Sequence, residues 1–211
     1  MNFLTELSEE IFLNTESLNE LKLSNNRISK ISKYTFQKLK KLTDLHLGNN
    51  QLTVLDPKTF EGLSSLIFLD LQNNQITFEI GSIEGMTYES ASRFAGLSNL
   101  EQLNLQNNSI TSLFEDFTLT NLRMLNLSHN KINLLQKIDL QYLQKDSLEI
   151  DLRHNQITEI NFRQDIDEND LSRKEVLLYH NPIKCDCHLL HFIKFIINQT
   201  KSVKKSPIVI D

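Results

Sequence analysis

Apolar residues recur along the chain in one pattern: two leucine-type residues flank a single position, and an asparagine follows three residues after the second. The repeated L-x-L-x-x-N unit occupies residues 21–26, 45–50, 69–74, 103–108 and 125–130, with degenerate copies at 150–155 and 176–181. Two inward apolar residues around one outward residue are typical of a short strand with one buried face. The pattern predicts seven strands, preceded by a half-copy that begins at Asn2 and is followed by Phe12.

One copy is too short to bury its own apolar face, so the copies must stack on one another. The consensus, extended to L-x-x-L-x-L-x-x-N-x-L, is identified as that of leucine-rich repeats. It predicts an α/β solenoid, a right-handed superhelix with a parallel concave β-sheet and a convex side of loops and turns. The leucines expected to be buried are Leu21, Leu23, Leu45, Leu47, Leu69, Leu71, Leu103, Leu105, Leu125 and Leu127.

Asparagine ends every copy, and this column helps to explain why 22 of the 211 residues are asparagine. We expect its side-chain amide to lie in the turn after the strand, bonding backbone groups that would otherwise be buried without partners. A phenylalanine column, including Phe36, Phe60 and Phe94, should fill the convex side. Both columns are therefore scaffold. The predicted asparagine ladder is Asn26, Asn50, Asn74, Asn108, Asn130, Asn155 and Asn181.

The ladder asparagines are spaced 24, 24, 34, 22, 25 and 26 residues apart. A period of 24 is typical of extracellular leucine-rich repeats, and the interval of 34 marks an insertion near residues 77–93. Such insertions emerge as loops on one face, so this one is a candidate contact element; a tolerated surface loop is the simpler alternative. The sequence thus predicts repeats over residues 1–184 and a different C-terminal segment over 185–211.

That segment opens with N-P-I-K-C-D-C at residues 181–187, followed by an apolar face at helical spacing over 189–197. The junction resembles the cysteine-rich C-terminal cap of extracellular leucine-rich repeats. The resemblance implies that Cys185 and Cys187 each pair with a later cysteine outside this chain, so that the cap here is truncated. The N-terminal half-copy likewise begins in mid-repeat, so both ends of the chain look cut from a longer protein.

Two stretches narrow the resemblance: the irregular penultimate repeat over residues 137–162 and the LLYHNPIKCDC junction over 177–187. Both are similar to the end of a leucine-rich block in Toll receptors, insect ones in particular. The resemblance implies part of the extracellular domain of a single-pass membrane receptor, held in the membrane by a segment missing here. It also implies a cytokine-like protein ligand, with a cystine-knot cytokine of the Spätzle kind as one candidate, and a receptor dimer as a candidate state of the parent.

Two other classes compete with a receptor. A secreted leucine-rich-repeat protein of matrix or humoral defence, without signalling function, remains open; a downstream hydrophobic segment in the full-length gene would separate it from a receptor. An intracellular scaffold is disfavoured, because a reducing cytosol gives the cysteine junction no purpose.

Composition excludes several functions. The net charge of −5 and the lack of a long Lys/Arg run argue against nucleic acid. No apolar run approaches 18 residues, so none spans a membrane, and the acidic N-terminal segment is not a signal peptide. No nucleophile–base pair, phosphate loop or paired-carboxylate motif stands out, so we expect neither enzyme activity nor a cofactor.

Zinc bound to Cys185, Cys187, His188 and His191 is the alternative to the disulfide cap. The spacing C-x-C-H-x-x-H matches no common structural zinc site, so no metal is predicted.

Candidate contact residues lie at outward strand positions and just beyond them, where the scaffold requires nothing apolar. Phe68, Met124, Leu177 and Tyr179 are the apolar or aromatic ones; the isolated surface residues found on any protein are the alternative interpretation. The remaining candidates are Asp70, Asp151 and Arg153, the two carboxylates being expected as solvated strand positions.

Three glycosylation sequons occur, at Asn107, Asn126 and Asn198. Chance sequons are frequent in an asparagine-rich chain, but an extracellular cap makes them candidate glycan sites. A glycan on Asn126 would cover part of the concave face and direct a ligand elsewhere.

One column contains three histidines, His129, His154 and His180, directly before the ladder asparagine. Earlier copies carry asparagine there: Asn25, Asn49, Asn73 and Asn107. Neighbouring repeats lie about 5 Å apart, so the three imidazoles should resist becoming charged together. The hypothesis is a pH-sensitive contact in the C-terminal repeats; a simple preference for a polar turn residue is the alternative.

Overall fold

The computed structural model describes residues 3–78, 93–94, 96–113, 119–136, 139, 148–161, 175–184 and 208–209. Most of the predicted insertion, the cysteines Cys185 and Cys187, the two histidines of the zinc alternative and the sequon Asn198 lie outside the described residues. Within this part of the chain, no helix is long and apolar enough to cross a membrane.

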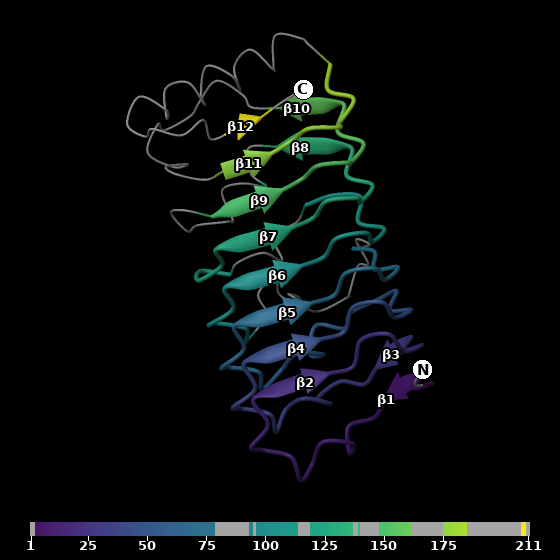
Figure 1. Cartoon of the computed structure of the whole chain (residues 1–211), viewed down its shortest axis with the longest axis vertical. Helices are drawn as coiled ribbons and strands as arrows, with labels where there is room; N and C mark the ends of the chain where they lie inside the picture. Colours follow the sequence, from purple (N-terminus) through teal and green to yellow (C-terminus); the bar gives the residue numbers. More distant parts are fainter. Residues whose placement is uncertain are drawn as a thin grey trace, which may run out of the picture.

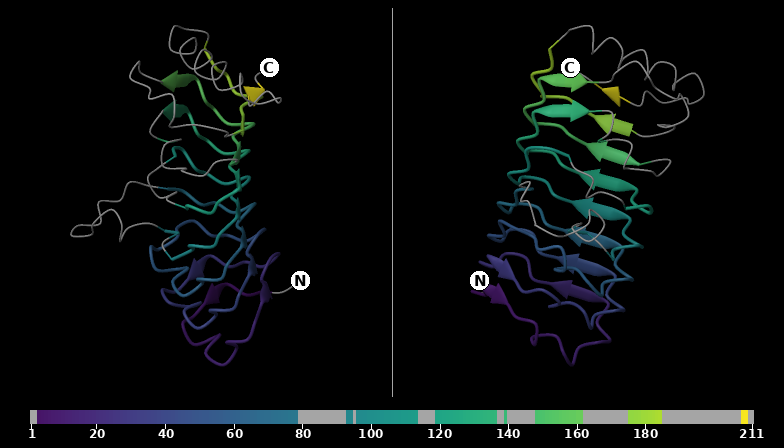
Figure 2. Two further views of the ribbon diagram at one scale, coloured as in Figure 1. Left: turned by 90° about the vertical axis from the view of Figure 1, so that its left-hand side faces the viewer. Right: turned by 180° about the vertical axis from the view of Figure 1, so that it is seen from behind.

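A parallel sheet of eight strands dominates the fold (Figure 1). In spatial order the strands are β2 (Glu20–Lys22), β4 (Asp44–His46), β5 (Phe68–Asp70), β6 (Gln102–Asn104), β7 (Met124–Asn126), β9 (Glu149–Asp151), β11 (Glu175–Leu177) and β12 (Ile208–Val209). Figure 2 shows these strands stacked along the long axis of the molecule. Equivalent repeat positions are register partners, as with Leu45, Leu69 and Leu103. The predicted leucine-rich-repeat solenoid is confirmed.

The predicted number of strands in the main sheet was too low by one. Seven strands come from the seven repeats, and β12 pairs with β11 as an eighth. The repeat pattern missed β12 because this strand contains only Ile208 and Val209 and carries no repeat consensus.

Two shorter sheets lie apart from the main one (Figure 1). In the first, β1 (Glu6–Leu7) pairs with β3 (Lys30–Ile31); in the second, β8 (Leu134–Gln136) pairs with β10 (Glu159–Asn161). The pairing of β1 with β3 shows that the N-terminal half-copy is the second half of a repeat, since it matches the segment after Asn26 at the 24-residue period.

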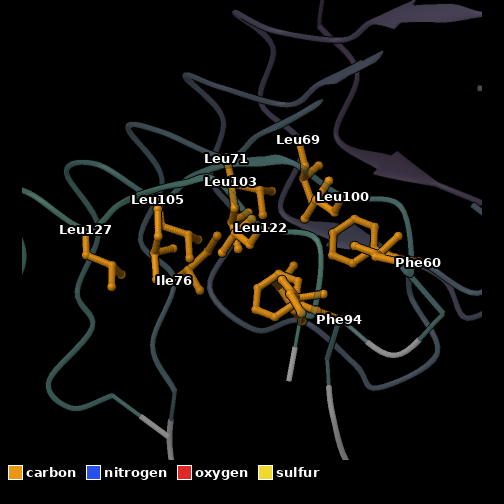
Figure 3. Close-up of a cluster of buried hydrophobic side chains, with 14 of the residues drawn as sticks. Phe60, Leu69, Leu71, Ile76, Phe94, Leu100, Leu103, Leu105, Leu122 and Leu127 are labelled. Carbon is orange, nitrogen blue, oxygen red and sulfur yellow. The ribbon is translucent and has the colours of Figure 1, made fainter. Parts of the chain in front are cut away.

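Leucine and phenylalanine columns form one continuous core (Figure 3). Nine of the ten leucines predicted to be buried are buried, whereas Leu21 is only half-buried. The reason is that β2 is the first strand of the sheet and has a neighbour on one side only. The rings of Phe12, Phe36, Phe60 and Phe94 stack in order, with centroids 5.8, 6.3 and 6.2 Å apart.

The ladder asparagines tie neighbouring repeats together. Asn74 shows the arrangement: its Nδ2 donates to the carbonyl oxygens of Leu71 (3.0 Å) and Leu47 (3.1 Å), and its Oδ1 accepts from the Leu52 N–H (3.0 Å). Leu47 and Leu52 belong to the preceding repeat, so one buried amide satisfies backbone groups in two repeats. The same bonds are made by Asn50, Asn108, Asn130 and Asn155.

Candidate functional site

The outward face of the main sheet presents two rows of side chains, one residue per strand in each. The first row is Glu20, Asp44, Phe68, Gln102, Met124, Glu149 and Glu175, each the register partner of the next. The second row, two residues later, is Lys22, His46, Asp70, Asn104, Asn126, Asp151 and Leu177. Strand stacking therefore brings residues from seven repeats onto one surface.

Apolar side chains reach this surface near its middle, on β5 and β7, and at its C-terminal end, on β11. Met124 is 43% exposed, whereas Phe68 and Leu177 are half-buried. The His46 ring lies against Phe68, with centroids 5.2 Å apart. Sequence reasoning missed Ile67, which is 42% exposed directly before Phe68. The sequence does contain an indication of this exposed residue. In the repeat that begins at Leu66, both residues between the first two consensus leucines, Leu66 and Leu69, are apolar.

Asp70 and Asp151 correct an expectation, since they are only 6% and 7% exposed rather than solvated. Asp70 Oδ1 accepts the N–H of Gln72 at 3.1 Å, and Asp151 Oδ1 accepts the N–H of Arg153 at 3.1 Å. Asn104 and Asn126 make the same bond two residues ahead. A side chain that caps the turn at the end of its own strand is drawn inward, which explains the burial.

Asp151 also holds Arg153. The Arg153 guanidinium donates through Nε to Oδ1 (2.9 Å) and through Nη2 to Oδ2 (2.7 Å). This hydrogen bonding raises the pKa of Arg153 above its usual value. The guanidinium lies 5.6 Å from the centroid of the half-buried Tyr179 ring. Three predicted contact residues are therefore brought together on adjacent repeats, with the cation already paired.

The histidine column has a backbone constraint that the sequence did not reveal. His129, His154 and His180 have φ of 56°, 55° and 60°, in the left-handed region. Their asparagine equivalents share it: Asn25, Asn49, Asn73 and Asn107. Asparagine and histidine are both enriched among residues that tolerate this conformation. A polar turn residue is therefore favoured at this position whatever its further role.

The three exposed imidazoles form a stack. Ring centroids of His129 and His154 are 4.2 Å apart, and those of His154 and His180 are 4.4 Å apart. Both separations are shorter than the 5 Å or so expected from strand spacing. Upstream, Asn107 Nδ2 donates to Asn73 Oδ1 (2.7 Å), so the column continues as hydrogen bonds between side chains.

The stack is expected to lower the pKa of its central imidazole, His154, below the ordinary value for histidine. Desolvation, and then the charges of His129, His180 and Arg153, lower the pKa of His154 from 6.5, while Asp151 opposes them. The unfolded chain therefore takes up this proton at a higher pH than the folded one. The free energy of unfolding should fall as the pH drops through about 6.5 toward the folded pKa. NMR titration of the three imidazoles measures this, and His154→Gln should remove the contribution; independent titration of all three near 6.5 would contradict it.

Two of the three sequons lie within the described residues. Asn107 is exposed in the turn column. Asn126 lies in the second row, where its Oδ1 accepts from the N–H (3.0 Å) and the hydroxyl (2.8 Å) of Ser128, the third residue of its sequon. A glycan on Asn126 Nδ2 would emerge two residues from Met124, on the same face of the sheet.

The fold and this face define a class: a repeat solenoid that presents a broad outward sheet surface. The chain belongs to the leucine rich repeat family, which matches residues 1–52, 16–76, 41–86 and 90–132. A second leucine-rich-repeat description matches residues 121–144. Proteins of this family are generally non-enzymatic protein-binding modules. No curated protein sequence gives a match to the chain.

Solved structures place the chain beside several repeat proteins. The Drosophila Toll–Spätzle complex, in its glycosylated form, contains a chain 30% identical to this one; the match covers 99% of this chain and 27% of that one, with a TM-score of 0.78. A leucine-rich-repeat protein of Leptospira interrogans is 26% identical over 100% of this chain and 52% of its own, with a TM-score of 0.64. Internalin C2 of Listeria monocytogenes is 25% identical over 99% and 76%, with a TM-score of 0.63. The chain thus spans about a quarter of the Toll–Spätzle chain that it matches.

Proposed function

We propose that this chain is a protein-recognition segment of the ectodomain of a Toll-type receptor with an innate-immune or developmental role. It would bind a cytokine-like protein ligand through the solenoid surface. The observation that carries the proposal is the similarity to a chain in the structure of the Toll–Spätzle complex. That chain is 30% identical to this one, and the match covers 99% of this chain with a TM-score of 0.78.

The outward face supports the same function. Its first row mixes exposed apolar and acidic side chains on rigid strands, which suits recognition of a protein surface. Met124, Arg153, Leu177 and Tyr179 remain candidate contacts, together with Phe68. Asp70 and Asp151 contribute by holding turns and, in the case of Asp151, by orienting Arg153.

Further proposals follow from a receptor ectodomain. Cys185 and Cys187 pair with later cysteines of the parent protein, and the chain lies on the extracellular side of the plasma membrane, where disulfides persist. Asn107, Asn126 and Asn198 then carry glycans. Peptide mapping by mass spectrometry after enzymatic deglycosylation, which converts each occupied asparagine to aspartate, measures the occupancy of each site in the secreted protein.

Binding to a Spätzle-type cystine-knot cytokine tests the proposal. Biolayer interferometry on the whole chain should give saturable binding, weakened about tenfold or more when Phe68, Met124, Leu177 and Tyr179 are together replaced by alanine. Val54→Ala is the matched control, because Val54 is 65% exposed and lies outside the strands. Absence of binding, or equal binding by the quadruple variant, would contradict the proposal.

The full-length transcript decides between a receptor and a secreted protein. A hydrophobic segment of about 20 residues downstream of the repeats would anchor a receptor. A stop codon without such a segment would instead support the secreted protein of matrix or humoral defence.

A further inference from the structure

The first row of the outward face has an ordered sequence of chemical types that spans seven repeats. Read from β2 to β11, it is acidic, acidic, aromatic, polar, apolar, acidic, acidic. The two ends are therefore alike, and the apolar residues occupy the middle. No repeat consensus requires this order, because these positions point away from the core.

Acidic neighbours at the two ends are unfavourable for the fold. Glu20 is the register partner of Asp44, and Glu149 is the register partner of Glu175. Like charges on directly adjacent strands destabilise a sheet. At the N-terminal end Lys22 offsets this, with its Nζ 2.8 Å from Glu20 Oε1, and the His46 Nε2 lies 3.3 Å from the same oxygen.

At the C-terminal end the charge is less compensated. Among the described residues, no cation forms a salt bridge with Glu149 or Glu175: Arg123 pairs with Glu101 (3.4 Å), and Arg153 pairs with Asp151 and attracts Glu149 only at longer range. The second row adds the buried carboxylate of Asp151 in the same region. A cationic group arriving at this end would relieve repulsion between Glu149 and Glu175 that no salt bridge among the described residues relieves.

The middle of the row offers an apolar anchor point. Ile67 and Met124 are 42% and 43% exposed, and the half-buried Phe68 adjoins both Ile67 and the first-row position of β6. Phe68 and Met124 are two strands apart, about 10 Å. An apolar centre with a charged rim is the usual arrangement of a protein-binding surface.

We infer that this face, made of the first row and Ile67, binds a basic protein segment that packs one apolar side chain on Ile67, Phe68 and Met124. Lysine or arginine side chains on either side of that anchor pair with Glu20 and Asp44 and with Glu149 and Glu175. Asp44 and Glu149 are four strand spacings apart, about 19 Å, so the partner's two cationic groups lie about 20 Å apart. The inference deepens the proposed function by giving the chemistry of the partner for the same face.

Selection from a phage-displayed library of random 16-residue peptides on the whole, immobilised chain tests this. Enriched peptides should carry net positive charge on both sides of an aromatic or aliphatic residue. One synthetic peptide from this set should bind about tenfold more weakly to Ile67→Ser/Met124→Ala. Glu149→Gln/Glu175→Gln should weaken it about three- to tenfold and reduce the salt dependence of binding.

Matched variants elsewhere separate this face from general effects. Glu6→Gln/Glu159→Gln removes two exposed strand carboxylates from the small sheets, and Val54→Ala removes an exposed apolar side chain; neither should change binding. Circular dichroism confirms that each variant is folded. Enrichment of acidic or neutral peptides, or unchanged binding by both Ile67→Ser/Met124→Ala and Glu149→Gln/Glu175→Gln, would overturn the inference. Failure to bind a Spätzle-type cytokine would instead count against the proposed function alone, because the peptide selection does not depend on that ligand.

Discussion

Asn74→Ala is expected to lower the free energy of unfolding by about 2–4 kcal/mol, because it leaves the buried N–H of Leu52 without a partner and removes one of the two asparagine bonds to each of two buried carbonyl oxygens. The carbonyl oxygens of Leu47 and Leu71 and the N–H of Leu52 each lose a side-chain bond of 3.0–3.1 Å. Water cannot replace these bonds, since Asn74 is only 8% exposed. For a typical domain stable by about 5–15 kcal/mol, this loss is a large fraction of the total. Urea denaturation followed by circular dichroism measures it.

Asn26→Ala is the matched control at the start of the same ladder. Asn26 is half-buried, and its Oδ1 accepts a longer, exposed bond of 3.3 Å from the N–H of Leu4. Solvent can replace part of what is lost, so about 1 kcal/mol is expected. Equal destabilisation by the two substitutions would show that burial of the ladder does not determine its contribution.

Sequence alone predicted the features that repeat. A leucine column recurring at a fixed period leaves one way to bury it, by stacking strands in register, and residues such as Leu45, Leu69 and Leu103 are paired accordingly. The asparagine column followed for the same reason, since a turn repeated beside a buried strand needs the same polar partner each time.

Features that depend on single positions were harder to predict. Asp70 and Asp151 are outward by strand alternation, yet they turn back to cap their own turns. To predict whether such a carboxylate faces solvent or accepts the N–H two residues ahead, the local turn geometry must be known. The order of the first row also became visible only when the register was known, because its members are spaced 22–34 residues apart in the sequence. The 4.2 Å approach of His129 and His154 likewise depends on side-chain conformation.

Gly62→Ala is expected to destabilise the solenoid by about 3–5 kcal/mol, through a left-handed backbone and a steric overlap that act together. Gly62 has φ of +96°, which an L-residue adopts only with strain. A Cβ there would lie 2.5 Å from both the Cα and the carbonyl oxygen of Gln37. Because these are backbone atoms of the preceding repeat, no side-chain rotation relieves the contact, and the two repeats must separate. Thermal denaturation followed by circular dichroism should show a markedly lower melting temperature.

Gly96→Ala provides a control at the equivalent position of the next repeat. The two positions are equivalent because each glycine lies two residues after a stacked phenylalanine, Phe60 or Phe94. Gly96 has φ of +88°, but no heavy atom of the described residues lies within 4 Å of its added Cβ. Only the backbone strain remains, so a loss of about 1–2 kcal/mol is expected. The difference between the two variants isolates the close contact between repeats. If both glycines tolerate alanine equally, the spacing between the repeats at Gln37 is adaptable, and tight stacking at that position does not contribute to stability.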